Sequence, residues 1–346
     1  MKARRSLVAL AAATLLLLAG CSEPEPPEPV VVDPEVVADK SAAPTAELPD
    51  TWPLTGVAGD VLERPALAVK VENSAQARPQ AGLAEADIVW EEMVEGGITR
   101  FNAVYHSALP EAVGPIRSVR PMDAGIAAPL GGPQVISGGQ SLFLREMQDA
   151  GVQLISHDGG AAGFYRNSQR RAPHNLFGDP EVFLSQAQAD DPPSEQFSFA
   201  LDASAASAVA AGEAATGLQL SFPRAAPSWT WGADSGAWLR SEGGSPAQTA
   251  DGERLAASNV VIMRVQIVNS AGRDQSGAPV PETVMTGEGE AVVASGGHTI
   301  TGTWRKDTLD APVTLTDGEG NVIELAPGNT WVELVPADRG NVTVQR

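Results

Sequence analysis

Residues 87–105, DIVWEEMVEGGITRFNAVY, contain two apolar runs on either side of a glycine pair. The first run is Asp87–Trp90 and the second is Phe101–Tyr105, and both contain the β-branched and aromatic residues that are typical of buried strands. Glu95-Gly96-Gly97 lies between the runs and supplies the residue types that a turn requires. The stretch therefore predicts a β-hairpin.

The sequence around this hairpin extends the same domain. Ala66–Val71 is a further short apolar run and predicts a buried strand. Ser141 is a good N-cap for a helix, and Gly151 lies where a C-cap glycine belongs. Val152–Ser156 predicts the next strand. Strands interspersed with short helices favour a mixed α and β domain over residues 51–185.

The second half of the sequence has a different composition. Residues 186–217 are rich in Ala, Ser, Asp and Pro and predict a connector, within which Ala200–Ala215 favours a helix of small residues. Residues 218–346 contain short β runs separated by turn residues, which predicts a β-rich C-terminal domain. We therefore expect an α+β fold, in which a layered mixed α/β domain is followed by a β-rich part. Whether the two halves form one body stays open.

The N-terminus has the pattern of a secretion signal over residues 1–20. Lys2, Arg4 and Arg5 precede the apolar run Leu7–Leu18, which is shorter than the roughly 20 residues of a permanent membrane span. The run ends in the lipobox Leu-Ala-Gly-Cys, whose Cys21 is the one cysteine of the chain. We expect lipidation at Cys21 and anchoring at the extracytoplasmic face of the cell membrane. The alternative is a plain cleaved signal with an incidental cysteine.

Residues 21–50 predict a lipidated cysteine followed by a disordered tether. Ser22–Asp50 holds seven prolines and eight acidic residues, a composition that cannot bury enough apolar surface to become ordered. The formal net charge of the chain is −20, and it becomes −23 once the three basic signal residues leave. So acidic a chain is a poor candidate for nucleic-acid binding, and its hold on the membrane should come from lipid.

Four segments carry a resemblance to a known family: RPALAVKVEN (64–73), ARPQAGLAEADIVWEEMVEGGITRF (77–101), GPIRSVRP (114–121) and RRAPHNL (170–176). These signature segments resemble the blocks of the YerB-like lipoprotein family, a bacterial group built around a domain of unknown function. GTWRKDTLDAPV and LAPGNTWVELVP near the C-terminus resemble the end of that family. The resemblance implies a surface lipoprotein with a layered mixed α and β fold, and it supplies no reaction.

Basic residues are scarce, yet many of them lie in the signature segments. The chain uses 19 arginines and four lysines, and a guanidinium presents a planar fork of donors that suits carboxylate or phosphate. The glycine-rich residues 137–141 precede the predicted helix, whose N-terminus favours negative charge. The predicted anion site consists of Arg78, Arg100, Arg117, Arg120, Arg171, His174 and Asn175. The alternative is internal ion pairing, because glutamates such as Glu72, Glu91, Glu92 and Glu95 lie in the same segments.

We expect an envelope binding or scaffolding protein whose ligand is a cell-wall glycan, a phosphorylated lipid intermediate or a protein partner. The alternative is an envelope enzyme that acts on a phosphorylated, lipid-linked glycan, by analogy with the order of elements in LytR-CpsA-Psr transferases. An enzyme of that kind needs an apolar channel beside Arg117, Arg120 and Arg171. The sequence indicates no catalytic residue, cofactor or metal site, since it contains no nucleophile elbow, phosphate loop or His-x-x-x-His pair.

Overall fold

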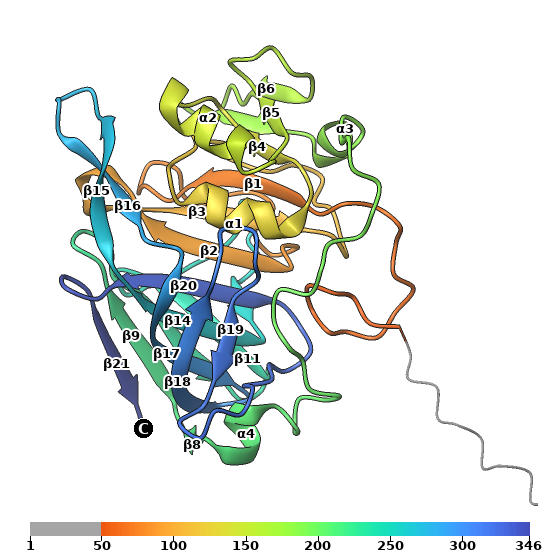
Figure 1. The fold of residues 1–346 in the computed structure, drawn as a ribbon, viewed down its shortest axis with the longest axis vertical. Coiled ribbons are helices and arrows are strands. Elements are labelled where there is room, and N and C mark those ends of the chain that lie inside the picture. Colours follow the sequence, from red (N-terminus) through yellow and green to blue (C-terminus); the bar gives the residue numbers. More distant parts are fainter. Residues whose placement is uncertain (1–49) are drawn as a thin grey trace, which may run out of the picture. The chain divides into compact units, whose positions relative to one another are not determined.

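One mixed sheet takes strands from both halves of the sequence (Figure 1). The computed structural model describes residues 50–346, which fall within one compact unit. The 11-stranded sheet has the order β19-β18-β17-β14-β20-β2-β3-β1-β4-β5, and β8 pairs with β18. Its strands are β1 (Leu67–Glu72), β2 (Ile88–Met93), β3 (Thr99–Tyr105), β4 (Gln134–Ile136), β5 (Leu154–Ser156), β8 (Glu213–Ala214), β14 (Asn259–Val265), β17 (Gly287–Ser295), β18 (His298–Lys306), β19 (Thr314–Thr316) and β20 (Thr330–Pro336).

Smaller sheets and short helices complete the fold. The 6-stranded sheet contains β9 (Gly217–Ser221), β10 (Pro227–Gly232), β11 (Ala237–Glu242), β12 (Ser245–Pro246), β13 (Ala256–Ala257) and β21 (Asn341–Gln345). Two further strand pairs are β15 (Ile267–Arg273) with β16 (Pro279–Thr283), and β6 (Phe164–Arg166) with β7 (Leu176–Gly178). The helices are α1 (Asp123–Ala127), α2 (Ser141–Asp149), α3 (Pro180–Leu184) and α4 (Ser207–Ala211), with 3-10 turns η1 (Glu95–Gly97) and η2 (Ala128–Leu130).

Strand β20 joins the two halves of the chain. It runs parallel to β2 from the N-terminal half, with Ile88 opposite Thr330 and Glu91 opposite Glu333. On its other edge it runs parallel to β14, with Asn259 opposite Thr330. Because the backbone hydrogen bonds of this sheet continue without a break from one half to the other, the two halves form one body.

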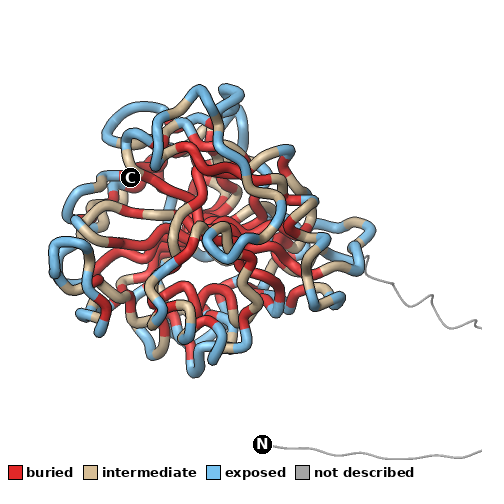
Figure 2. The backbone as a smooth tube through the Cα atoms, turned by 90° about the horizontal axis from the view of Figure 1, so that it is seen from above, coloured by how far each residue is buried: buried red, intermediate tan, exposed pale blue. Residues whose placement is uncertain are grey.

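Alternate residues of the central strands face two different cores. On β1, Leu67, Val69 and Val71 pack in the same core cluster as Trp229 and Trp238 of the 6-stranded sheet. Residues on the opposite face, such as Ala68 of β1, pack in the cluster that holds Ile126 of α1. Figure 2 shows the buried segments in the interior, surrounded by exposed loops. Burial on both faces explains why β1 is apolar nearly throughout instead of alternating.

The local sequence predictions for the N-terminal half are largely confirmed. Strands β2 and β3 pair as an antiparallel hairpin whose turn is η1, and β1 starts at Leu67. The helix predicted after Ser141 is α2, although Gln140 occupies the N-cap position. Gly151 has a φ of 78°, the left-handed conformation expected of a C-cap glycine.

The helix predicted over Ala200–Ala215 is wrong in extent. Only α4, Ser207–Ala211, is helical. Asp202 Oδ1 accepts hydrogen bonds from the backbone N–H groups of Ser204 and Ala205 at 2.8 and 3.2 Å, so it holds the preceding residues in a turn. After α4 the chain enters the short strand β8. Overall the structure is a strand-rich α+β protein with few, short helices.

The predicted signal, the lipobox with Cys21 and the tether lie outside the described residues, apart from Asp50 at the end of the tether. Within residues 50–346, no helix combines the length and apolar character that crossing a membrane requires.

Candidate functional site

Glu72, the last residue of β1, connects three of the signature segments. Its carboxylate accepts hydrogen bonds from Arg117 Nε at 2.8 Å and from Ser74 Oγ at 2.6 Å, and it lies 2.8 Å from His174 Nδ1. Burial alone would raise the pKa of Glu72, but the hydrogen bonds from Arg117 and Ser74 outweigh it and hold the pKa below its usual range. Arg117 and His174 are therefore engaged with an ionised glutamate inside the protein.

Arg120 is held by a second glutamate. Its Nη2 lies 2.7 Å from Oε1 of Glu95, and its Nε donates to Oε2 at 2.8 Å, which makes a two-pronged ion pair. Glu95 is presented by η1, the turn of the central hairpin. The backbone N–H of Arg120 donates to Asp123 Oδ2 at 2.7 Å. The guanidinium and the backbone N–H of Arg120 are thus both held in place by carboxylates in the absence of a ligand.

Arg100 differs from its neighbours because no carboxylate pairs with it. On β3 it lies opposite Glu72 of β1 and Glu92 of β2 in the register of the sheet. Its Nη1 donates to the carbonyl of Ser118 at 3.0 Å, and within residues 50–346 no carboxylate oxygen lies within 4.0 Å of its guanidinium. Burial lowers the pKa of Arg100 to about 10; the positive charges of Arg120 and Arg117 contribute to the decrease, and the charges of Glu95 and Glu92 oppose it.

Arg100 and Arg120 line the same groove, which has a volume of about 710 Å³. Ser118, Glu95, Asp158 and Arg273 are also among the residues that line it. Gln140, the N-cap of α2, contributes to the wall and donates its side-chain N–H to the carbonyl of Arg273 at 2.8 Å. Asp274 also lines the groove, so three carboxylates accompany its three guanidiniums, and Glu95 is paired with Arg120. Arg100 and the start of α2 are the parts of the groove that suit a negatively charged group. We call it the arginine groove.

The other predicted site residues lie elsewhere. Arg78 pairs with Glu242 at 3.2 Å and lines a separate cleft of about 380 Å³. Asn175 is buried and accepts a hydrogen bond from Arg166 at 2.9 Å. Arg171 is exposed. The structure thus brings Arg100 and Arg120 together in one groove, places Arg117 and His174 on Glu72 beside it, and separates Arg78, Arg171 and Asn175.

Two buried charge clusters were missed by the sequence predictions. Arg240 of β11 is fully buried and pairs with Glu91 at 2.6 Å, with Glu242 at 2.5 Å and with Glu333 at 2.8 Å. Its guanidinium also lies 4.7 Å from the ring centre of Trp331. We call this set the Arg240 cluster. The available signal was a pair of acidic residues inside the apolar strand IVWEEM.

The second cluster lies on the opposite face of β2. Lys70 is fully buried, contacts Glu92, and donates to Asp123 Oδ1 at 2.7 Å. Asn102 donates to the same oxygen of Asp123 at 2.9 Å. Burial raises the pKa of Glu92 to about 7, and the nearby charge of Asp123 adds to the increase. The signal in the sequence was Lys70 itself, a charged residue in the middle of a buried strand.

Within the described part of the chain, no group of three or more His, Cys, Asp and Glu side chains is arranged to hold a metal ion.

Comparisons with known proteins identify both halves. Residues 54–193 match the family described as "Protein of unknown function (DUF3048) N-terminal domain", and residues 218–332 match the corresponding C-terminal domain. The chain is 26% identical over 329 residues to YerB of Bacillus subtilis (strain 168), which its name describes as a candidate lipoprotein. The match covers 86% of this chain and 89% of the relative.

A solved structure supports the same assignment for the fold. The crystal structure of the YerB protein from Bacillus subtilis aligns with a TM-score of 0.71 and 23% identity, and the alignment covers 86% of this chain and 100% of the other. Both family models and the arrangement of strands agree with the resemblance seen in the signature segments. The chain therefore belongs to the YerB-like family, whose N- and C-terminal DUF3048 domains it contains.

Proposed function

We propose that this protein is a lipid-anchored binding protein of the cell envelope, whose arginine groove holds an anionic group of its ligand. The lipobox at Cys21 and the name of its Bacillus relative support the lipid anchor and a position at the extracytoplasmic face. The ligand classes that fit are a phosphorylated lipid intermediate and an acidic envelope glycan. Both present phosphate or carboxylate oxygens to a guanidinium fork.

The single observation that carries the proposal is the state of Arg100. A partly buried guanidinium normally has a carboxylate partner, because an unpaired charge is costly to bury. Arg100 has the carbonyl of Ser118 instead, and Arg120 is close enough to lower its pKa, an effect that the charge of Glu95 only partly offsets. A bound phosphate or carboxylate would compensate the unpaired charge of Arg100, so its binding should be favourable.

The surrounding residues prepare this site for a ligand. Glu95 pairs with the Arg120 guanidinium and so fixes the position of this side chain in the wall of the groove. Ser118 contributes its backbone carbonyl to Arg100, and its hydroxyl lies 3.1 Å from that of Ser137. Little side-chain entropy remains to be lost on binding, since both guanidiniums are already ordered.

The alternative of a glycan transferase receives no support from the positions of its expected residues. Arg117 is bound to Glu72, and Arg171 is exposed, so of these three arginines only Arg120 lines the arginine groove. The apolar side chains that line the groove are Val94 and Ile98. These two residues do not amount to an apolar channel for a lipid, which makes binding the better-supported function.

Titration calorimetry of the full chain with inorganic pyrophosphate and with glucuronate tests the proposal. We expect at least one probe to bind, and we expect Arg100→Gln to weaken its binding at least tenfold. Arg305→Gln is the matched control, because Arg305 is exposed on β18 and the same charge is lost there. Failure of both probes to bind the wild-type chain, or equal weakening by the two variants, would overturn the anion site.

A further inference from the structure

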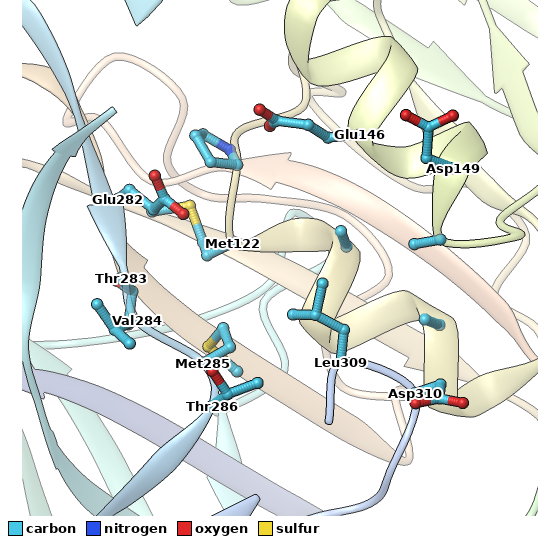
Figure 3. Close-up of a pocket in the computed structure, with 14 residues that line it drawn as sticks. Met122, Glu146, Asp149, Glu282, Thr283, Val284, Met285, Thr286, Leu309 and Asp310 are labelled. Atoms are coloured by element: carbon cyan, nitrogen blue, oxygen red, sulfur yellow. The ribbon is translucent and has the colours of Figure 1, made fainter. Parts of the chain in front are cut away.

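We propose that the protein contains a second binding site, an acidic groove that takes an aliphatic polyamine, whose ammonium groups are separated by methylene runs. The groove has a volume of about 670 Å³, within the range of small-molecule sites. It is lined by residues of α1, α2 and β16 and of the segments after β16 and β18 (Figure 3). This site shares no lining residue with the arginine groove.

The charged side chains that line the acidic groove are all negative. Glu146 and Asp149 come from α2, Glu282 comes from β16, and Asp310 follows β18. None of the residues that line the groove is a lysine, arginine or histidine. A cation is therefore the complementary ligand for this surface.

Nearby basic groups offset these carboxylates only in part, because Arg145 lowers the pKa of Glu146 and Lys306 lowers that of Asp310, yet neither basic side chain lines the groove. Arg145 is exposed on α2 and does not line the groove. Lys306 is buried and donates to the carbonyl of Ala311. Burial raises the pKa of Glu282, and burial together with the charge of Glu282 raises that of Glu146. A bound cation would relieve both effects.

The surface between the carboxylates is apolar. Met122 and Met285 are buried in its floor, and Leu309 is 45% exposed. In Figure 3 Leu309 lies between Glu146 and Asp149 on one side and Asp310 on the other, and Met122 lies beside Glu282. The alternation of charge, apolar surface and charge matches an alkyl chain with an ammonium group at each end.

A buried hydroxyl provides the second, independent observation. Thr283 lines the acidic groove and is 1% exposed, yet its Oγ1 has no hydrogen-bond partner within the described residues. Buried hydroxyls are normally satisfied, and an unpaired one costs free energy. The N–H of a bound ammonium group could donate a hydrogen bond to this oxygen.

A polyamine fits this surface better than a basic peptide does. A peptide would lay backbone N–H and C=O groups against Met122, Met285 and Leu309, which offer them no partners. The methylene runs of a polyamine carry no such groups. We therefore commit to a polyamine, and peptide binding becomes an outcome that contradicts the proposal.

Titration calorimetry of the full chain with spermidine tests the acidic groove. We expect binding that Glu146→Gln/Glu282→Gln weakens at least tenfold. The matched control is Glu111→Gln/Glu319→Gln, which removes the same two charges from exposed positions that do not line the groove, and it should change the affinity by less than twofold. If the first double variant does not fold, Asp149→Asn/Asp310→Asn replaces it, since both residues are exposed.

Further measurements separate a built site from diffuse attraction. Leu309→Ser should weaken spermidine binding at least threefold, and Arg100→Gln should leave it unchanged. Equal weakening by the two double variants, tighter binding of trilysine than of spermidine, or displacement of spermidine by an equal concentration of Mg²⁺ would each overturn the proposal.

Discussion

Arg240 Nη2 lies 2.6 Å from Oε2 of Glu91, and both side chains are fully buried. Arg240 comes from β11 of the 6-stranded sheet, and Glu91 comes from β2 of the 11-stranded sheet. The contact therefore connects the two sheets, and through them the two halves of the sequence. Glu333 of β20, opposite Glu91 in register, pairs with the same guanidinium.

Replacing Arg240 should destabilise the whole protein. Arg240→Ala removes the guanidinium that pairs with Glu242 and Glu333, and breaking a buried pair costs about 3–5 kcal/mol. We expect the free energy of unfolding, measured by urea denaturation, to fall by at least that amount. Arg305→Ala breaks exposed ion pairs, which contribute little to stability, and should leave the free energy of unfolding nearly unchanged. Similar losses in the two variants would contradict a role for the Arg240 cluster in stability.

The same cluster should make stability depend on pH in an unusual direction. Burial raises the pKa of Glu91 to about 8 from an ordinary 4.5; the charge of Arg240 opposes the increase, and the charge of Glu333 adds to it. Between these pH values the folded protein holds a proton that the unfolded chain has released, so stability is lost as the pH rises. Glu92, with a pKa of about 7, acts in the same direction.

We therefore expect the free energy of unfolding to decrease between pH 5 and pH 8, with Glu91→Gln making the decrease shallower. Denaturant unfolding at several pH values measures this. Glu319→Gln is the control, because Glu319 is exposed and its loss should leave the slope unchanged. Glu72 and Glu95 have lowered pKa values and act below this pH window. An unchanged slope in Glu91→Gln would show that Glu91 does not titrate in this range.

Local features of the fold were predictable, whereas the pairing of distant strands was not. The β2–β3 hairpin follows from two apolar runs around Gly96 and Gly97, since all its hydrogen bonds are local. The apolar run at Thr330–Leu334 predicts a strand, but nothing in it indicates that β20 enters between β14 and β2. Parallel strands that are far apart in the sequence are brought together by the packing of the whole core. The sequence of one strand therefore does not indicate which strands it will pair with.

The candidate site shows the same division. The arginines of the signature segments were expected to gather, and Arg100 and Arg120 do share a groove. The carboxylate partners of these arginines depend on tertiary structure. Arg120 pairs with Glu95, which lies 25 residues earlier in the same half of the sequence, whereas Arg78 pairs with Glu242 from the C-terminal half. The acidic groove could not be predicted, because its carboxylates come from separate segments without a shared motif.

Lipid anchoring can be tested at Cys21. Cys21→Ala removes the thiol that would be acylated, and the chain has no other cysteine to replace it. We expect the variant to lose incorporation of labelled fatty acid and to leave the washed membrane fraction, since one acidic domain has little electrostatic attraction to anionic lipid. Ser22→Ala, next to the same site, should keep both properties. Retention of label in Cys21→Ala would exclude this cysteine as the acylated residue.

A glycine beside the arginine groove should be intolerant of substitution. A Cβ built on Gly139 would lie 2.5 Å from Cγ1 of Val119, and Val119 is buried between Ser118 and Arg120. Because a β-branched side chain is stiff at χ1, Gly139→Ala must displace the segment that carries both groove residues. We expect a loss of about 1–3 kcal/mol in the free energy of unfolding, and weaker pyrophosphate binding than in the wild-type chain. Gly318→Ala is the matched control, since its Cβ would meet no atom within 4 Å. If Gly139→Ala unfolds at the same urea concentration as Gly318→Ala and binds pyrophosphate normally, Val119 does not hold the groove in shape.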